Sequence, residues 1–594
     1  MEYCRRCAFL NTACREDRIL IKKILYILLL FVLFPVIVFG LEINQITPQQ
    51  IAKSSAVDIQ PTLVAGTATW SIVLGPEWLS IDSSTGQITG TTDAIGEANY
   101  VQVKAVNSSE YDIMTFILVV GSQAIYTMGP GAEDFSTLAG AMAGIAAGDV
   151  LIITSGTYAD VISETADRVT KNGIDAANMT SYICDQPMGC VFSSVYLKGA
   201  QFIGFKGFSS SGGITIDGED KGGVLANHVK FQMCEAKAGM GPLLGATYTL
   251  WEDCIAYGNG RAKLRVGSTG TDSNYTIFRR CVVRNDYYEG GVNPCATIMG
   301  YGGDNTLFQN VIVIDESQDV ANFTSCNDRY GAIEAKNNDG FYIKDSIILN
   351  NYYGGFFGDT GTTGVRLSNT VFIDIGTGSR TYSSDTLFDH ISVINVDPQS
   401  TANTFDDVSG SITAYFTNSV FEDIVGTGTG TPPNLTSKMI LYQMTESDNN
   451  LFYNYGDLTI GDSTGIIVDT DPGIIYPIRI ETGSPAETNT VGAEILKRRG
   501  AYGTYWGQTG YDTLGAIDLW PFPNEDQIHD NMQAFSYVSG VYNVDGNRGF
   551  AVAGETLTKY IWQYLGAAIP SEVYGFTQAQ THGGGSFSGM GNHR

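Results

Sequence analysis

The sequence predicts an all-β protein whose main body is a parallel β-helix, a coil of short stacked strands. A unit of a few apolar residues, a polar pair and a small or β-branched residue recurs through residues 229–421. The residues that close successive units are 20, 27, 30, 35, 24, 21 and 28 positions apart. Repeats of this size are typical of solenoids, and short strands without helical spacing favour the β-helix among them.

Two columns of residues are expected to face the inside of the coil, because alternate residues of a strand lie on the same face. The first column is Cys234, Cys254, Cys281, Val311, Ser346, Thr370, Ile391 and Ser419, and the second is Ala236, Ala256, Val283, Val313, Ile348, Phe372, Val393 and Phe421. A flat β-sandwich is the alternative fold. It would need hairpin turns about every 8–12 residues, and the turn signals of this sequence fall at other intervals.

Composition limits the class of partner. The chain has 594 residues, enough for several domains, and a net charge of −28. Such an acidic chain argues against nucleic acid and anionic membrane surfaces as partners. It suits an extracellular protein, and calcium is the one cofactor that the acidic composition suggests. The five histidines are scattered without the spacing of metal ligands.

Residues 1–40 have the pattern of an export signal. Lys22 and Lys23 precede an apolar run that ends at Phe39, and the small residue Gly40 follows. This pattern predicts cleavage before Leu41 and an extracellular or cell-surface location. An uncleaved anchor is the alternative, although a run of roughly 17 apolar residues is marginal for a membrane span.

Residues 41–122 are expected to form a β-sandwich. Trp78 and Ile81 would fill its core, Gly86 would close a turn, and residues 100–106 alternate as a strand. This stretch resembles the Ig-like, cadherin-like module of bacterial surface proteins. The resemblance implies either a spacer or an adhesion module, and both interpretations stay open.

Residues 123–485 are expected to hold the β-helix. Ser136 can cap an alanine-rich helix that stops at Gly148, and a buried strand over residues 150–153 follows. This order, continued by a Gly-Thr-Tyr turn, resembles the start of the pectate-lyase-like right-handed parallel β-helix superfamily. The resemblance implies a right-handed coil whose first end is closed by the helix, because an open end would expose apolar side chains.

Residues 486–577 differ in composition and are expected to form a small mixed C-terminal appendage. One short helix would start after Asn524, and another would cover residues 557–565. The dense aromatic residues of this region are expected to pack against the coil, with a glycan-binding face as the alternative. Residues 578–594 are rich in glycine and serine and are predicted to be disordered.

The superfamily resemblance implies an enzyme that cleaves polysaccharides, either a lyase or a glycoside hydrolase. Arg329, Glu334 and Lys336 resemble the rung of chondroitinase-B-like lyases in which carboxylates hold calcium and a lysine abstracts a proton. The arginine expected about one rung further is absent from residues 354–359. The catalytic residues therefore stay unknown, with these three as the candidates.

Two pairs of adjacent tyrosines are the better signal for a binding surface. They lie at the same offset from their first-column residues, two rungs apart, which places them about 10 Å from each other. Two acidic residues belong to the rung between them. The predicted binding residues are Tyr287, Tyr288, Tyr352, Tyr353, Asp315 and Glu316. Aromatic rings beside carboxylates suit a sugar or a bridging cation; the alternative is that the tyrosines cover a loop.

The cysteines divide into two groups. Cys295 and Cys326 fall in the same loop of adjacent rungs, about 5 Å apart, so they are expected to form a disulfide. Cys184 and Cys190 are the candidates for a second, short disulfide loop in an oxidising compartment. The three first-column cysteines are expected to stay reduced, because side chains in register along a coil are poorly aimed at one another.

Three hypotheses of function follow. The first is an exported surface or secreted protein that interacts with a polysaccharide or cell-surface glycan, adhesive or structural, without recognisable catalytic motifs. The second is a polysaccharide lyase or glycoside hydrolase with a non-standard site. The third is a self-associating subunit of a surface sheath or filament.

Overall fold

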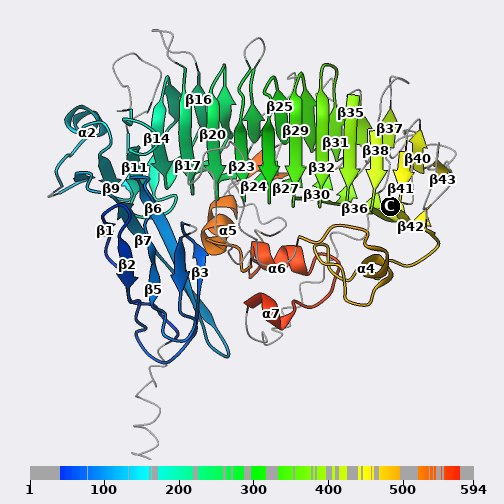
Figure 1. Cartoon of the computed structure of the whole chain (residues 1–594), viewed down its shortest axis with the longest axis horizontal. Coiled ribbons are helices and arrows are strands. Elements are labelled where there is room, and N and C mark those ends of the chain that lie inside the picture. Colours follow the sequence, from blue (N-terminus) through cyan, green and yellow to red (C-terminus); the bar gives the residue numbers. More distant parts are fainter. Residues whose placement is uncertain are drawn as a thin grey trace, which may run out of the picture.

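Figure 1 shows the chain as a computed structural model. The structure describes residues 40–76, 78–131, 133–159, 162, 172–218, 225–258, 262–268, 272–285, 296–315, 332–351, 355–375, 379–381, 384–396, 405–407, 414–424, 439–442, 446–455, 458–460, 467–495, 520–533, 536–538, 541–543, 550 and 554–574. Statements about structure below concern these residues.

The main body is a right-handed parallel β-helix, as the sequence predicts, built from three parallel sheets. Sheet A contains β8 (Ile125–Met128), β9 (Val150–Ile153), β11 (Thr180–Cys184), β14 (Gln201–Lys206), β17 (Asn227–Gln232), β20 (Thr247–Glu252), β23 (Thr276–Arg279), β26 (Thr306–Gln309), β29 (Asp339–Lys344), β32 (Thr363–Ser368), β35 (Ser384–Asp389), β38 (Ala414–Thr417) and β41 (Glu446–Asp448).

The chain turns from each strand of sheet A into sheet B. Sheet B contains β10 (Gly156–Thr157), β12 (Cys190–Phe192), β15 (Phe208–Ser210), β18 (Glu235–Ala236), β21 (Ile255–Ala256), β24 (Val282–Asn285), β27 (Ile312–Asp315), β30 (Ile347–Asn351), β33 (Val371–Ile375), β36 (Ser392–Val396), β39 (Val420–Ile424), β42 (Leu451–Tyr455) and β44 (Ile467–Val468).

The third side of the coil is sheet C. It contains β13 (Val195–Lys198), β16 (Gly213–Asp217), β19 (Gly239–Leu243), β22 (Leu264–Val266), β25 (Ile298–Tyr301), β28 (Ile333–Lys336), β31 (Phe356–Gly358), β34 (Ser379–Thr381), β37 (Phe405–Asp407), β40 (Met439–Tyr442) and β43 (Leu458–Ile460).

A column of left-handed residues forms the corner between sheets A and B. This corner column is Met233, Asp253, Arg280, Asn310, Asp345, Asn369, His390, Asn418 and Asn449, with φ between 47° and 53°. Each member directly precedes the residue that closes a sequence repeat. Both predicted inward columns are buried, none of their members being more than 2% exposed. The first residue of the polar pair therefore ends a strand of sheet A, and the second forms the turn that follows. That second residue has a left-handed backbone, which asparagine and aspartate tolerate better than other side chains.

Stacked aromatic rings fill the inside of the coil. Phe231 and Trp251 have ring centroids 3.9 Å apart, and Trp251 lies 5.6 Å from Phe278. Phe278 continues the stack to Phe308 at 5.2 Å. The next two rungs carry Ile343 and Leu367 at this position, and rings return with Phe388 and Phe416, 4.4 Å apart. Parallel strands in register bring like residues together on adjacent rungs, so an aromatic position shared by successive repeats becomes a stack.

The N-terminal part is a β-sandwich. One sheet contains β1 (Gln49–Ile51), β3 (Thr69–Leu74), β6 (Ala98–Val106) and β7 (Tyr111–Val120), and the other contains β2 (Ala56–Ile59), β4 (Leu79–Ile81) and β5 (Ile88–Thr91). Trp70 and Phe116 are central to its core. Trp78 and Ile81, which the sequence places in the core, are only partly buried and pack against its edge.

A short helix, α2 (Leu138–Gly144), lies between β8 and β9 at the start of the coil, where the sequence places the closing helix. The expected cap at Ser136 is wrong by one residue, because Thr137 accepts the hydrogen bond from the Gly140 backbone. The helix also ends earlier than Gly148, since Ile145 already has an extended backbone.

The C-terminal region packs on the outer face of sheet B. Its elements are α4 (Pro485–Asn489), α5 (Glu525–Gln533), α6 (Leu557–Trp562), α7 (Ser571–Tyr574) and the hairpin of β45 (Ser536–Val538) and β46 (Val541–Asn543). The helices lie along one side of the coil, next to the sandwich (Figure 1). Trp520, Phe522 and Trp562 are buried against sheet B, as expected of core aromatics. Across the described residues, no helix is long and apolar enough to cross a membrane.

Candidate functional site

The structure tests only part of the predicted sites. Tyr287, Tyr288, Tyr352, Tyr353 and Glu316, as well as Arg329, Cys295 and Cys326, lie outside the described residues. Asp315 is the last residue of β27, and only its backbone is described. The tyrosine surface and the Cys295–Cys326 disulfide therefore stay predictions.

Glu334 and Lys336 both point outward from β28, at alternate positions of sheet C. Glu334 is completely buried. Lys336 forms an ion pair with Asp359 and lies 5.8 Å from the Tyr301 ring centroid. Burial acts to lower the pKa of Lys336, but Asp359 outweighs it and leaves that pKa above its ordinary value. A lysine held in its protonated form is the opposite of what proton abstraction needs.

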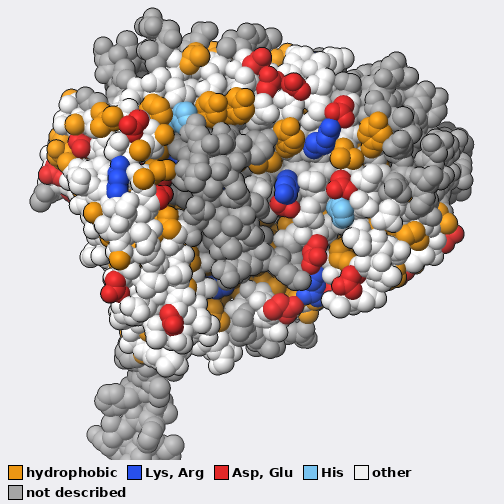
Figure 2. All heavy atoms as spheres, viewed as in Figure 1, with side chains coloured by type: hydrophobic (Ala, Val, Ile, Leu, Met, Phe, Trp, Pro, Cys, Tyr) orange, Lys and Arg blue, Asp and Glu red, His pale blue; other side chains and the backbone are white. Residues whose placement is uncertain are grey.

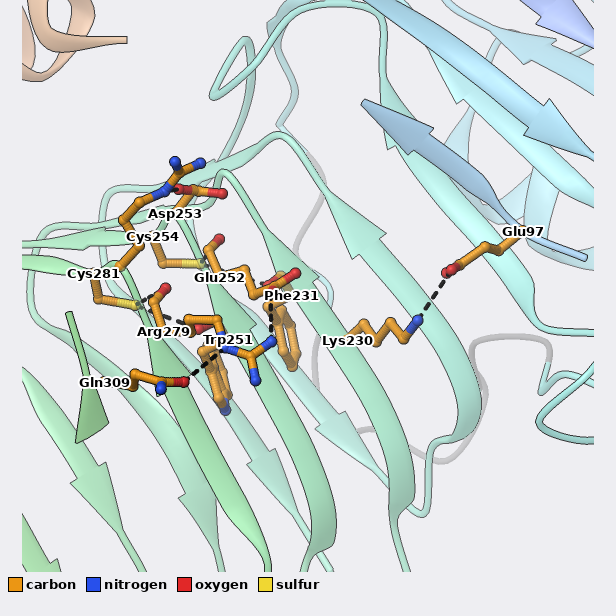
Figure 3. A network of polar contacts seen from close by, with 11 residues as sticks. Glu97, Lys230, Phe231, Trp251, Glu252, Asp253, Cys254, Arg279, Cys281 and Gln309 are labelled. Atoms are coloured by element: carbon orange, nitrogen blue, oxygen red, sulfur yellow. Dashed lines mark hydrogen bonds and ion pairs between the residues drawn. The ribbon is translucent and has the colours of Figure 1, made fainter. Parts of the chain in front are cut away.

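The described cysteines behave as expected. Cys184 and Cys190 form a disulfide that joins the end of β11 to the start of β12. Cys234, Cys254 and Cys281 are reduced and buried in register, and Figure 3 shows Cys254 and Cys281 side by side on adjacent rungs. Burial raises the pKa of the Cys254 thiol, with contributions from the two neighbouring thiols. The row is therefore part of the coil interior and unsuited to thiolate chemistry.

A row of aromatic side chains runs along the outer face of sheet A. This aromatic row consists of Phe202, His228, Tyr248 and Tyr275 on four successive rungs. Ring centroids are 5.1 Å apart from Phe202 to His228, then 4.8 Å from His228 to Tyr248 and 4.8 Å from Tyr248 to Tyr275. Figure 2 shows hydrophobic side chains gathered beside a histidine over the first strands of sheet A.

All four residues of the aromatic row have a left-handed backbone, with φ between 52° and 57°. Such a conformation is a true outlier for bulky side chains and costs roughly 1–3 kcal/mol per residue. Stacking returns roughly 0.5–1.5 kcal/mol per pair of rings. The next three rungs carry Asn305, Gly340 and Gly364 at the same position, which adopt this backbone at little cost. The aromatic residues are thus present although the left-handed backbone at their positions is unfavourable for bulky side chains.

The aromatic row has one end that a ligand can reach. The rings of Tyr248 and Tyr275 are nearly parallel, with 4° between their planes, so they stack along the coil axis and turn their edges outward. Tyr275 is 37% exposed, and no ring covers its other face. That face is directed along the axis toward Asn305; Gly340 and Gly364 follow at the same position on the next two rungs, with the Tyr342 side chain against Gly340.

Sequence inspection missed this row, although a signal existed. His228, Tyr248 and Tyr275 lie six positions before Cys234, Cys254 and Cys281, which close the first three repeats, and Phe202 lies one rung earlier. The closing residues alone define the repeat, and they do not reveal a shared position upstream of each strand.

The outer face of sheet A also carries buried charges, shown in Figure 3. Lys206 and Lys230 contact the Glu97 carboxylate at 3.3 Å and 3.0 Å, which fastens the sandwich to the coil. Arg279 contacts Glu252 at 3.0 Å on the rungs beyond. Burial acts to raise the pKa of Glu97, but the two lysines outweigh it and hold that pKa below its ordinary value. These charges are engaged with one another and serve packing.

No group of three histidine, cysteine, aspartate or glutamate side chains within the described residues is arranged to hold a metal ion. The described part of the chain therefore assigns no calcium site.

Comparison with known proteins gives similarities of fold only. No family model matches the sequence, and no curated protein matches it. Among solved structures, pectate lyase Pel9A is 14% identical, with 59% of this chain and 82% of that one covered at a TM-score of 0.33. The PL6 family alginate lyase AlyGC is 13% identical, with 62% of this chain and 57% of that one covered at a TM-score of 0.38.

A third similar structure is the A-module of the Azotobacter vinelandii mannuronan C-5 epimerase AlgE6. It is 10% identical, with 56% of this chain and 93% of that one covered at a TM-score of 0.32. Similarities at this level carry no activity over to this chain, and the three parallel sheets establish the β-helix by themselves.

Proposed function

We propose that this protein is an exported, cell-surface or secreted glycan-binding protein, and that a glycan docks on the end of the aromatic row. The observation that carries the proposal is the placement of four aromatic side chains at left-handed positions, ending in the exposed face of Tyr275. A sugar ring has an apolar face that can continue such a stack, as the next aromatic ring would.

The position beyond Tyr275 favours a single sugar ring as the group that docks. Asn305, Gly340 and Gly364 succeed Tyr275 at one position per rung. The Tyr342 side chain lies against Gly340, so a sugar ring stacked on Tyr275 would lie over Asn305 and meet Tyr342 beyond it.

Binding is preferred over catalysis for a chemical reason. Glu334 is buried, and Lys336 is paired with Asp359 and has a raised pKa. Lys206, Lys230, Arg279 and Arg366 on sheet A are each paired with a carboxylate. Neither candidate of β28, Glu334 or Lys336, is therefore a base poised for proton abstraction.

Two observations support export. The first 40 residues have the basic flank and apolar core of a secretory signal. The Cys184–Cys190 disulfide fits a protein that matures in an oxidising compartment.

The test measures binding of the mature protein to a panel of soluble polysaccharides by affinity electrophoresis and calorimetry. We expect Tyr275→Ala to weaken binding by about tenfold, within the range of an aromatic contact at a recognition site. Tyr275→Phe should retain most of the affinity, because it keeps the ring face. Tyr415→Ala is the matched control, since Tyr415 lies outward on sheet A but outside the aromatic row.

Thermal stability should hardly change in Tyr275→Phe, whereas Tyr275→Ala should lose the stacking on Tyr248, roughly 0.5–1.5 kcal/mol. Equal loss of affinity in Tyr275→Ala and Tyr415→Ala would remove the aromatic row as the site. The same incubations are assayed for unsaturated products and new reducing ends. Cleavage of any polysaccharide would show that the protein is an enzyme and contradict the proposal of binding alone.

A further inference from the structure

The turns that lead into sheet A beside Tyr275 carry three carboxylates, which bear on the kind of sugar that docks there. Asp272 lies three residues before Tyr275, and Asp304 directly precedes Asn305 on the next rung. Asp339 has the position of Asp304 one rung further along the coil. The backbone N–H of Tyr275 donates to the backbone oxygen of Asp304 at 2.9 Å. One edge of the docking position is therefore lined with acidic residues.

The carboxylate of Asp304 is fixed between two rungs. Its Oδ1 accepts from the backbone N–H of Asp339 at 2.9 Å, which directs the side chain along the coil axis beyond Asn305. The backbone N–H of Asp304 in turn donates to Oδ1 of Asn274, one rung earlier, at 2.7 Å. Within the described part of the chain, no hydrogen bond or ion pair engages Oδ2 of Asp304. That oxygen is available to a ligand.

The other two carboxylates border the same edge. Oδ1 of Asp339 accepts from the Thr363 hydroxyl at 2.8 Å. A Cβ built on Gly364 would lie 3.6 Å from this oxygen, so the Asp339 carboxylate lies beside the row, further along the coil axis. Oδ1 of Asp272 lies 2.8 Å from a Cβ built on Gly302, at the start of the next turn. The negative charges therefore follow one another from rung to rung.

The cations that flank these turns do not compensate the three carboxylates. Lys336, three residues before Asp339, is paired with Asp359. Arg366, on β32, contacts Asp385 at 2.7 Å. Among the described residues, none of the three carboxylates has an ion pair. The docking position is therefore locally negative, as the whole chain is with its charge of −28.

The ring of Tyr275 gives a second and independent reason to expect a positively charged ligand. The face of an aromatic ring is the negative part of its quadrupole and attracts a cation placed over it. Tyr275 turns its uncovered face toward Asn305. An ammonium group at this position would be attracted by both the ring and Asp304, whereas a carboxylate would be repelled by both.

We propose that the sugar docked on Tyr275 is an amino sugar, with its ammonium group over Asn305 and beside the free oxygen of Asp304. The inference rests on the proposed glycan binding and names its class of ligand, a hexosamine with an unmodified amine. Asp304 is the specificity-determining residue, because it attracts the ammonium group and repels a uronic acid. Asp339, one rung further, adds to the same preference.

The test compares methyl glycosides that share one ring and differ in charge. The probes are the methyl glycosides of the amino sugar, of its N-acetyl derivative, of the neutral sugar and of the uronic acid, in the gluco and galacto series. Affinities to the mature protein are measured by saturation-transfer NMR at about pH 6, where the amine is protonated. We expect the amino sugar to bind about tenfold more tightly than its N-acetyl derivative, the combined size of a cation–aromatic contact and an exposed ion pair. The uronic acid should bind most weakly.

Asp304→Asn tests the specificity-determining residue without disturbing the turn. It keeps the Oδ1 acceptor and gives this rung the residue type that Asn274 already provides one rung earlier. We expect it to weaken the amino sugar about threefold, the size of one exposed ion pair, to leave the N-acetyl derivative unchanged and to strengthen the uronic acid. Asp339→Asn should have the same effects in smaller measure, because its carboxylate lies further along the axis.

Asp58→Asn is the matched control. Asp58 is an exposed carboxylate of the sandwich that accepts from Gln87 at 2.9 Å, so its variant removes the same charge away from the row. It should leave the affinities of all four probes unchanged. Tyr275→Ala should weaken the amino sugar, because the ammonium group loses the ring beneath it.

Four results would overturn the inference: an amino sugar that binds no more tightly than its N-acetyl derivative, a uronic acid that binds more tightly, equal effects of Asp58→Asn and Asp304→Asn, or an amino sugar that is indifferent to Tyr275→Ala. Polysaccharide binding that depends on Tyr275, together with no preference for the amine, rejects the amino sugar and keeps the proposed function. Independence of Tyr275 for every polysaccharide and every glycoside rejects the proposed function, and the inference with it.

Discussion

The fold raises the pKa of the Glu422 carboxyl. It lies in β39, near Asp423 and near Asp471 of the segment that follows β44. Partial burial raises the pKa of Glu422 to about 7, and the two neighbouring aspartates add to the shift. The folded chain therefore favours the protonated carboxyl, which carries no charge against its neighbours.

This residue predicts a pH dependence of stability. A folded pKa above the unfolded value means that the carboxyl must ionise at a cost, so stability falls as the pH rises from about 4.5 through about 7. Glu422→Gln should remove this part of the slope and raise the free energy of unfolding at pH 8. We expect about 1 kcal/mol, since the side chain is partly exposed and solvent screens it.

The measurement is urea unfolding at several pH values between 4.5 and 8. Glu42→Gln is the control, because it removes an equal charge from an exposed position. A gain at pH 8 that is matched by Glu42→Gln, or that persists unchanged at pH 4.5, would contradict the assignment to Glu422.

For single residues, the sequence could predict which side chains face the inside of the coil but not which distant residues come into contact. The inward columns follow from the repeat, because the pattern within one strand decides them. Arg280 and Trp520 lie 240 positions apart in the chain, and no local pattern brings them together. The aromatic row stands between these cases, since its members share a repeat position but only the three-dimensional register shows their rings in contact.

The corner column is the element that turns each rung. Asn418, with φ of 51°, is representative of it. Its Nδ2 donates to Asp389 at 3.0 Å, and its Oδ1 accepts from Asn449 at 2.9 Å. The side chains thus link one rung to the next along the corner, in addition to the parallel strands on either side.

Replacement of Asn418 separates two contributions of this corner. Asn418→Ala loses the side-chain hydrogen bonds and places a Cβ in the left-handed region, so we expect a loss of about 2 kcal/mol. Asn418→Gly loses the same bonds without the backbone penalty and should cost about half as much. Denaturant midpoints of the two variants check this. Equal losses would show that the left-handed backbone contributes nothing to the difference.

Among the elements, those governed by local pattern were predictable. The strand Val150–Ile153, the parallel coil and the helix at its start were expected from the sequence and are present. The cap moved from Ser136 to Thr137 because both hydroxyls can satisfy a helix start and only the three-dimensional structure selects one. The outward residues of sheet B gave no comparable signal in the sequence, because their burial depends on which other segment packs against them.

On the scale of the whole molecule, the three parts are joined by specific contacts. Tyr111 of the sandwich stacks on Tyr574 at 5.7 Å and donates to Glu525 at 2.9 Å. Glu97 contacts Lys206 and Lys230 of the coil at less than one-tenth exposure. The sandwich is therefore held at a fixed position against the coil.

Glu97→Gln should weaken this joint, because it leaves two buried lysines without their carboxylate. Removal of one partner from a buried ion pair costs about 3–5 kcal/mol. The pKa of Glu97 is below its ordinary value, so the stability that this ion pair contributes is present above about pH 4.5 and is lost as the pH falls through the folded pKa.

At pH 7 we expect calorimetry of Glu97→Gln to show the sandwich melting separately and earlier than the coil. Glu110→Gln is the control, since among the described residues that carboxylate accepts from Leu41 and Asn107, both in the sandwich itself. Because the coil keeps its own core, glycan binding through Tyr275 should survive Glu97→Gln at temperatures below the first transition. A single unshifted transition in Glu97→Gln would mean that the buried charges do not hold the sandwich to the coil.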